Sequence, residues 1–333
     1  MDFSQRLRAG QQRVDQALAL LLPVQEAFPA VIHESMRYSA LAGGKRLRGV
    51  LVLEAAVAAG APRPGSLPAA SPAARGTALT PAQLAAVGPV LAAAAAVEMV
   101  HTYSLIHDDL PCMDDDDWRR GQPTNHRVYG EGIAVLAGDA LLTRAFEVVS
   151  RLPWAGCEPA QSVQIAGELA IAAGTGGLIG GQVVDLEAER RPGEEESHRA
   201  RLGGPADDVQ LLEYIHTHKT GALFCAAARI GALAAGADEP ALAALGEYAK
   251  RLGLAFQIVD DLLDIEGDER LLGKGVGADA RRGKLTYPAL YGVEAARRRA
   301  RDEVEAAKAA LAPFGERASF LEELAEFTLA RRS

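Results

Sequence analysis

Cysteine and aromatic residues are scarce in this chain of 333 residues, and each scarcity excludes a class of protein. The three cysteines, Cys112, Cys157 and Cys225, form no CxxC pair, so the sequence has neither a disulfide framework nor a zinc-ligand spacing. We interpret them as reduced thiols of a cytoplasmic protein. Aromatic residues make up 5 % of the chain while alanine and leucine abound, and this composition favours helices over sheets.

The sequence also lacks an excess of basic residues and a long hydrophobic run. The net charge of −9 argues against a nucleic-acid partner, because such proteins normally carry a basic face. The longest apolar stretch, 87–97, ends at Glu98 and is too short for a membrane span. The N-terminal residues MDFSQRLRAGQQR are polar and lack the apolar centre of a signal peptide. An acidic surface still allows anionic substrates, provided that local basic residues and metals reverse the field.

Apolar residues recur at helical spacing over most of the chain, and no strand pattern stands out. We predict one all-α domain over residues 1–333. The predicted helices are 3–28, 31–58 with an interruption at Gly43 and Gly44, 89–109, 131–151, 160–188, 207–235, 238–265, 285–311 and 317–331. Thr80 followed by Pro81 is typical of a further helix start. Two segments, 59–81 and 190–206, are rich in proline, glycine or charge and are predicted as loops, the first of them mobile.

A first cluster of aspartates follows the apolar stretch and has the pattern DDxxxxD. It is formed by Asp108, Asp109 and Asp114. An EF-hand counted from Asp114 is excluded, because its sixth and twelfth positions hold Arg119 and Asn125 instead of glycine and glutamate. Carboxylates crowded beside arginines indicate Mg²⁺ with a polyphosphate, and a solvated acidic loop is the alternative.

A second cluster, Asp260, Asp261 and Asp264, lies in the stretch FQIVDDLLD. Spacings of three and four residues place these carboxylates on one helical face, where like charges destabilise the helix unless a cation compensates. The neighbouring residues are apolar, as in a protein core. We therefore expect a second metal-binding cluster that faces the first across one cavity. A helix end with surface acids is the alternative.

Basic residues beside glycines supply candidate groups for binding phosphate. In GGKRLR (43–48) the two glycines let a phosphate approach the backbone, and Lys45 and Arg48 project together. Arginine binds phosphate through paired hydrogen bonds, whereas lysine acts as a point charge. The segments 219–221 and 273–284 add further cations. Each group alone is a weak signal, because exposed cations are commonplace.

Taken in order, these motifs resemble those of the trans-isoprenyl diphosphate synthases. They are GGKRLR, EMVHTYSLIHDDLPCMDDDDWRRGQPTNH, GGQVVDL, HKTGAL, FQIVDDLLD and GKLTYPAL. The resemblance covers roughly residues 30–330 and is strongest to bacterial farnesyl diphosphate synthases. It implies an all-α bundle around a deep central cavity and a homodimer. The implied reaction joins isopentenyl diphosphate to dimethylallyl or geranyl diphosphate and yields farnesyl diphosphate.

The resemblance also assigns roles to the residues at matching positions. About three Mg²⁺ ions, or Mn²⁺ in their place, would bind with the allylic diphosphate. Their ligands would be Asp108, Asp109, Asp114, Asp260, Asp261 and Asp264. Further contacts to the allylic diphosphate would come from Arg119, Lys219, Thr220, Gln257, Lys274 and Lys284. The residues expected to be catalytic are Asp108, Asp109, Asp114, Asp260 and Lys219.

Isopentenyl diphosphate would occupy a second anion site that needs no metal. Its ligands would be Lys45, Arg48, His101 and Arg120, while Gln182 and Asp185 would support the reaction centre. From the residues alone, a lone histidine is more often a buried hydrogen-bonding group, and we keep that interpretation for His107 and His126. The segments 111–130 and 266–284 are predicted to close over the site and exclude water.

Product length is expected to depend on Tyr103, five positions before Asp108, with Ser104 beside it. At a rise of about 1.5 Å per residue, Tyr103 lies about 7.5 Å along the helix from Asp108. The resemblance implies that an aromatic residue there stops elongation at the farnesyl stage. An ordinary core aromatic is the alternative interpretation of Tyr103.

Other functions share parts of this pattern. A geranylgeranyl diphosphate synthase has the same motifs, and a non-catalytic synthase subunit typically lacks one aspartate cluster, whereas both are intact here. A terpene cyclase needs no isopentenyl diphosphate, so Lys45, Arg48 and His101 argue against it. A generic acidic metal-binding protein leaves the basic motifs unexplained. Two features depart from the family: the loop 59–81 is long, and Trp118 replaces a smaller apolar residue.

Overall fold

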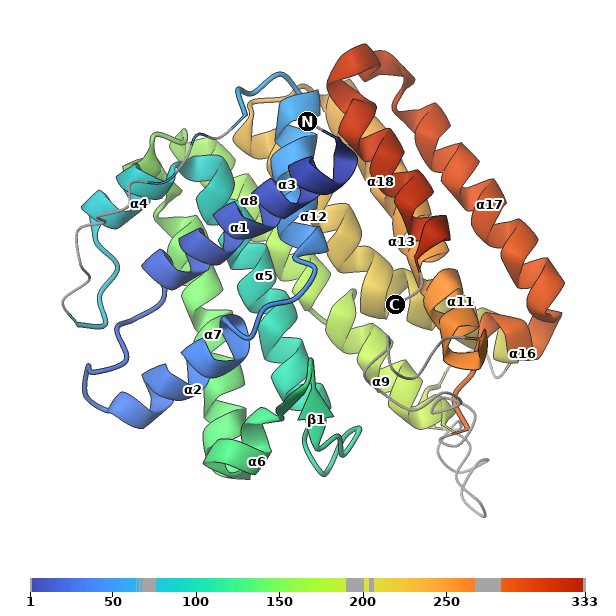
Figure 1. Ribbon diagram of the computed structural model, residues 1–333, viewed down its shortest axis with the longest axis horizontal. Helices are drawn as coiled ribbons and strands as arrows, with labels where there is room; N and C mark the ends of the chain where they lie inside the picture. The colour runs from blue at the N-terminus through green and yellow to red at the C-terminus, as the bar shows by residue number, and fades with distance from the viewer. Residues whose placement is uncertain are drawn as a thin grey trace. The chain divides into compact units, whose positions relative to one another are not determined.

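The structure is a computed structural model that describes residues 2–63, 65, 67, 76–189, 201–203, 207–266 and 283–331. Its regular elements are helices, apart from one hairpin of strands β1 (Trp118–Arg119) and β2 (Gln122–Pro123) (Figure 1). The chain divides into two compact units, which are Met1–Leu169 with Ala227–Glu239, and Ala170–Ala226 with Pro240–Ser333.

The observed helices follow the segments predicted from apolar spacing. Their bounds are α1 (Phe3–Leu21), α2 (Ala30–Ala40), α3 (Leu47–Ala58), α4 (Pro81–Val87), α5 (Pro89–Asp108), α6 (Asn125–Tyr129), α7 (Glu131–Ser150), α8 (Pro159–Ala173), α9 (Leu178–Ala188), α11 (Asp208–Ile215), α12 (Ala222–Ala234), α13 (Glu239–Glu266), α16 (Tyr287–Tyr291), α17 (Val293–Ala310) and α18 (Ser319–Ala330). Short helices of other types are η1 (Leu152–Ala155), η2 (His216–Gly221) and η3 (Ala312–Ala318), of which η2 is a π-helix. Several predicted helices are interrupted, and the longest interruption separates α2 from α3 at 41–46.

In the first unit, α5 is a core helix that carries the first aspartate cluster at its C-terminal end. Its alanines, Ala92–Ala96, are completely buried, and their small side chains let α1, α3 and α7 approach closely (Figure 1). Two stretches are long and apolar enough to cross a bilayer: α5, whose apolar window is 78 % buried, and Pro159–Ala188, whose window is 44 % buried. The burial of α5 is that of a core helix.

The helix start predicted at Thr80 is confirmed. Thr80 accepts a hydrogen bond from the backbone of Gln83, and Gln83 accepts one from the backbone of Thr80 in return, which satisfies two otherwise unpaired donors. Just before it, Arg144 of α7 donates to the carbonyl of Thr77, and Arg151 donates to that of Leu79. The end of the predicted loop 59–81 is thus held against α7. Much of its middle, and most of the predicted loop 190–206, lie outside the described residues.

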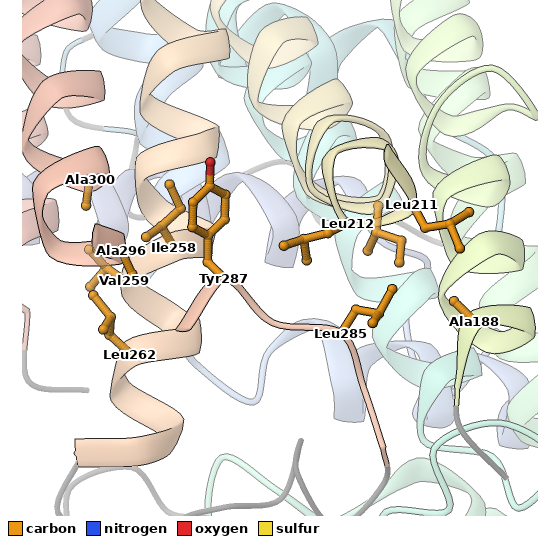
Figure 2. Close-up of a cluster of buried hydrophobic side chains, with 11 residues drawn as sticks. Ala188, Leu211, Leu212, Ile258, Val259, Leu262, Leu285, Tyr287, Ala296 and Ala300 are labelled. Atoms are coloured by element: carbon orange, nitrogen blue, oxygen red, sulfur yellow. The ribbon is translucent and has the colours of Figure 1, made fainter. Parts of the chain in front are cut away.

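In the second unit, a cluster of buried apolar side chains holds α13 in place. Figure 2 shows Tyr287 between Ile258 of α13 and Leu212 of α11, with Leu285 and Ala188 in the same cluster. The cluster fixes the C-terminal half of α13, which carries the second group of aspartates.

Candidate active site

The first aspartate cluster lies where α5 ends and the chain folds back on itself. Asp108 is the last residue of α5, and the backbone nitrogen of Asp114 donates to its carbonyl over 2.8 Å. The backbone nitrogen of Asp116 likewise donates to the carbonyl of Asp109 over 3.3 Å. The longer spacing of DDxxxxD therefore forms a loop that returns Asp114 to the side of Asp108.

Asp109 is oriented by Arg119 from strand β1. The carboxylate of Asp109 is 3 % exposed, and Nε of Arg119 donates to its two oxygens over 2.7 and 2.9 Å. Burial raises the pKa of Asp109, and the hydrogen bonds and charge of Arg119 offset this only in part. Arg119 thus orients this buried carboxylate and counteracts part of the effect of its burial.

Arg120 follows in the tight turn of the hairpin. Arg120 and Gly121 have φ values of 54° and 75°, as a two-residue turn between antiparallel strands requires. The guanidinium of Arg120 donates to the carbonyl of Gly43. A Cβ atom at Gly44 would lie 2.6 Å from that guanidinium, so a side chain there would displace Arg120. The turn therefore carries Arg120 to the GGKRLR segment.

These two adjacent arginines have opposite electrostatic surroundings. Burial would lower the pKa of Arg119, but its hydrogen bonds and charge interactions with Asp109 and Asp116 leave it raised. The pKa of Arg120 is lowered, first by burial and then by the charge of Arg46. Arg119 therefore belongs to the carboxylate cluster, whereas Arg120 lies near the cations Arg46 and Arg119, whose effect the charges of Glu98 and Asp15 oppose.

His101 and Arg48 lie close to each other, and His101 is also near Arg120. Nη1 of Arg48 lies 3.3 Å from Nε2 of His101. Burial holds the pKa of His101 well below its usual range, and the charges of Arg48 and Arg120 lower it further. A neutral His101 accepts the hydrogen bond from Arg48. The structure thus brings together His101, Arg48, Arg120 and the turn that precedes Lys45.

Arg46 differs from its neighbours Lys45 and Arg48 because its side chain points into the protein. Its φ of 45° is left-handed, and its buried guanidinium donates to Asp15 over 2.7 Å and to the carbonyl of Ala40 over 2.6 Å. Arg46 therefore anchors the segment that presents the other two cations.

A partly open hollow of about 370 Å³ lies between α2, α5 and the hairpin. Asp109, Arg119, Arg120, Tyr38 and Thr102 are among the residues that line it. The hollow gives the carboxylate cluster and its arginines access to solvent on this side.

In the second unit, the three aspartates of α13 have different surroundings. Asp261 is buried and accepts hydrogen bonds from Gln257 over 3.1 Å and from the backbone of Tyr287 over 2.9 Å. Asp260 is partly exposed and accepts from Arg331 over 2.8 Å, while Asp264 is buried. Asp260 is thus the most accessible of the three, while Asp261 is held by two hydrogen bonds.

The π-helix η2 presents Lys219 and Thr220. Nζ of Lys219 lies 2.6 Å from Asp185 of α9, and Oγ1 of Thr220 donates to Gln257 over 2.8 Å. A Cβ atom at Gly181 would lie 2.1 Å from the backbone nitrogen of Lys219, so α9 packs directly on the π-helix. A π-helix often occurs at functional sites. The π-helix η2 begins at His216, directly after the last residue of α11.

Lys284 reaches the same carboxylate, with Nζ 3.4 Å from Asp185. Burial would raise the pKa of Asp185, but the charges of Lys219 and Lys284 outweigh it and leave the pKa below its usual value. The amide of Gln182 is buried, and none of the described residues hydrogen-bonds to either end of it. The remaining predicted ligand, Lys274, lies outside the described residues.

The residues of both clusters fit Mg²⁺ by their chemistry. Within the described part of the chain, no three His, Cys, Asp or Glu side chains form a ready-made metal site. Mg²⁺ usually binds one or two carboxylates together with substrate phosphates, so a complete protein cage is not required. Asp108 and Asp114, whose backbones are joined by a hydrogen bond, could supply such a partial ligand set.

Comparison with known proteins decides the family. A family model described as polyprenyl synthetase matches residues 29–313. This chain belongs to the polyprenyl synthetase family. The farnesyl diphosphate synthase of Escherichia coli (strain K12) is 43 % identical over 338 residues, which cover 99 % of each chain. An Arabidopsis thaliana heterodimeric geranylgeranyl pyrophosphate synthase large subunit is also 43 % identical, over 91 % of this chain and 74 % of its own.

A solved structure confirms the fold of this polyprenyl synthetase. The FPP/GFPP synthase of Zymomonas mobilis superposes with a TM-score of 0.76 at 33 % identity and 98 % coverage of both chains. The predictions of family and of an all-α fold are thereby confirmed. The chain is a trans-prenyl diphosphate synthase, a family that uses divalent metal ions. Its relatives leave the product length open, because farnesyl and geranylgeranyl synthases are equally similar.

Some residues that shape the site escaped prediction from the sequence. Glu98 looked like the end of an apolar run, yet it lies buried within α5 and accepts a hydrogen bond from the backbone of Gly49 over 2.8 Å. His216 is buried 3.4 Å from Asp261. No local signal marks either residue, because each acts on a segment far away in sequence. The hairpin was also missed, since its strands have only two residues each.

Proposed function

We propose that this protein makes farnesyl diphosphate by joining isopentenyl diphosphate to dimethylallyl diphosphate and then to geranyl diphosphate. The allylic substrate loses its diphosphate, and the double bond of isopentenyl diphosphate attacks the resulting cation. A proton is then lost to the departed diphosphate, so no side-chain nucleophile is needed. The task of the protein is to stabilise the leaving diphosphate, hold the second substrate and exclude water.

The proposal assigns the allylic diphosphate to both aspartate clusters with about three Mg²⁺ ions, which when bound neutralise the leaving group. Asp108, Asp109, Asp114, Asp260 and Asp264 are the proposed metal ligands. Asp261 is also a proposed metal ligand. It would bind the metal through the oxygen lone pairs that its hydrogen bonds from Gln257 and Tyr287 leave unoccupied. Arg119, Lys219, Thr220, Gln257, Lys274 and Lys284 are the proposed direct contacts to the same diphosphate.

The separate environments of Arg119 and Arg120 carry this proposal. One arginine is paired with carboxylates, and the next lies among cations beside a neutral histidine. Two substrates that each carry a diphosphate need two separate anion-binding sites, one that contains metal and one that does not. Lys45, Arg48, His101 and Arg120 are therefore the proposed ligands of isopentenyl diphosphate.

Tyr103 supports the choice of farnesyl diphosphate as the product. The side chain is buried on α5, five positions before Asp108, and burial together with the charge of Asp108 raises the pKa of Tyr103 to about 12. The phenol therefore remains neutral in any ordinary assay. We propose that its ring, with Ser104 beside it, limits the space into which the product grows.

A product assay tests the proposal. Purified protein is incubated with Mg²⁺, labelled isopentenyl diphosphate and each of three primers: dimethylallyl, geranyl and farnesyl diphosphate. We expect farnesyl diphosphate from the first two and little turnover of the third. A dominant geranylgeranyl product would establish the second candidate, a geranylgeranyl diphosphate synthase, with which this chain shares 43 % identity. Unchanged turnover after Asp108→Ala and Asp260→Ala would contradict the metal assignment.

A homodimer and a cytoplasmic location belong to the same proposal. The resemblance of the motifs implies the homodimer, and the three free cysteines support the cytoplasmic location. The segments 111–130 and 266–284 are proposed to close over the substrates. Most of the second segment lies outside the described residues.

A further inference from the structure

His107 occupies a fitted slot between α5 and α7. Its Nε2 lies 3.0 Å from the carbonyl oxygen of Val135, to which it donates a hydrogen bond in the matching tautomer. A Cβ atom at Gly138 would lie only 2.1 Å from this nitrogen. The absence of a side chain at position 138 is therefore what makes room for the imidazole.

The other side of His107 contacts Tyr103, one helical turn earlier on α5. The two rings meet edge to face, with centroids 5.7 Å apart and planes at 82°. The hydroxyl of Tyr103 is buried, and no described residue hydrogen-bonds to it. Packing alone thus fixes the direction of the tyrosine ring, and His107 supplies part of that packing.

We infer that His107 is a positioning residue for product length, because it holds Tyr103 in the orientation that ends elongation. This inference rests on the proposed function, in which the Tyr103 ring limits the product. A tyrosine on a helix has few allowed rotamers, and a neighbour that fills the adjacent space selects among them. Without the imidazole, the ring can turn into the emptied slot and leave room for a longer chain.

Two single variants test this from opposite sides of the slot. His107→Ala removes the ring that supports Tyr103. Gly138→Ala leaves His107 and Tyr103 unchanged but places a methyl group where the imidazole now lies. We expect both variants to raise the ratio of geranylgeranyl to farnesyl product by about two- to tenfold. This factor corresponds to the free energy of one contact between aromatic rings. The ratio is measured by chromatography of products labelled from isopentenyl diphosphate, with geranyl diphosphate as primer.

Gly132→Ala is the matched control for Gly138→Ala. Both glycines lie in α7, but a Cβ atom at Gly132 would meet nothing within 4 Å. Its product ratio is expected to equal that of the wild type. His107→Phe keeps an aromatic ring beside Tyr103, so this variant is expected to make farnesyl diphosphate as the wild type does. The thermal unfolding midpoint and kcat/KM for geranyl diphosphate show whether each variant is folded.

A double substitution separates this inference from the proposed function. Tyr103→Ala is expected to lengthen the product, and adding His107→Ala should then change nothing more, because no ring remains to be positioned. If Tyr103→Ala lengthens the product while His107→Ala and Gly138→Ala leave it unchanged, the inference is wrong and the proposed function stands. If Tyr103→Ala leaves the product unchanged, the proposed role of Tyr103 fails, and the inference fails with it.

Discussion

Lys219 and Asp185 form a close ion pair, with Nζ 2.6 Å from Oδ2, that joins the π-helix η2 to α9. Lys284 lies 3.4 Å from the same oxygen. Asp185 is nearly buried, so its charge depends on these two lysines. The pair holds Lys219 at the position proposed for binding the leaving diphosphate.

Asp185→Asn should destabilise the protein at neutral pH and much less in acid. At pH 7 the variant leaves two lysines without their carboxylate, at a cost of about 2–4 kcal/mol in the free energy of unfolding. The pKa of Asp185 is lowered in the folded protein. Its stabilising contribution is therefore present above the unfolded pKa of about 3.9 and is lost as the pH falls through the folded value.

Urea unfolding of wild type and variant at pH 7 and in acid measures this difference. Asp302→Asn, at an exposed position of α17, is the matched control and should change little at either pH. A destabilisation by Asp185→Asn that is the same at both pH values would show that packing, and not charge, makes the residue important.

Glu54 should show the opposite dependence on pH. It is buried in α3 beside Arg63, and none of the described residues hydrogen-bonds to its second oxygen. Burial raises the pKa of Glu54 in the folded protein, and Arg63 offsets this only in part. The neutral form of Glu54 therefore makes its full contribution to stability below the unfolded pKa of about 4.3. This contribution is lost as the pH rises through the folded pKa.

Glu54→Gln removes this penalty. We expect the variant to gain about 1 kcal/mol relative to the wild type between pH 4.5 and pH 8, measured from the thermal unfolding midpoints. A relative loss of stability at pH 8 would show that the ion pair with Arg63 outweighs the cost of burial.

Local signals made much of this fold predictable from the sequence. Thr80 and Pro81 mark a helix start by themselves, and the spacing of apolar residues predicted the position of α13. Arg46 shows the limit of such signals. In the sequence it is one cation of three, but a left-handed backbone turns its side chain inward to Asp15. That direction depends on partners from α1 and α5, which residue spacing within 43–48 does not reveal.

Glu98 should be as important for substrate binding as for stability. Its Oε1 accepts the backbone N–H of Gly49 in the first turn of α3, where a carboxylate also interacts favourably with the helix dipole. That turn contains Arg48. Glu98→Ala leaves a buried donor without an acceptor and should cost about 3 kcal/mol, whereas Glu98→Gln keeps an acceptor and should cost less.

Kinetics separate the two effects of Glu98. Because α3 presents Arg48, we expect Glu98→Ala to raise KM for isopentenyl diphosphate more than KM for geranyl diphosphate, with Glu98→Gln between it and the wild type. Equal increases for both substrates would mean that the substitution disturbs the unit in general and has no specific effect on the isopentenyl diphosphate site.

Arg331, beyond the end of α18, should compete with the metal for Asp260. Its Nη2 donates to Asp260 over 2.8 Å, and its guanidinium lies 3.9 Å from the ring centroid of Phe256. Asp260 is a proposed metal ligand, so a cation bound to it must move or share the carboxylate when the metal binds. We expect Arg331→Gln to tighten Mn²⁺ binding about three- to tenfold, measured by electron paramagnetic resonance without turnover.

Arg317→Gln, at an exposed position of η3, removes one positive charge from the same unit and is the matched control for the general electrostatic effect. If both variants tighten Mn²⁺ binding equally, the contact with Asp260 has no specific role. If Arg331→Gln instead weakens Mn²⁺ binding, the role of Arg331 is to orient Asp260 for the metal. The positive charges of Arg331 and the metal would then act together on the diphosphate.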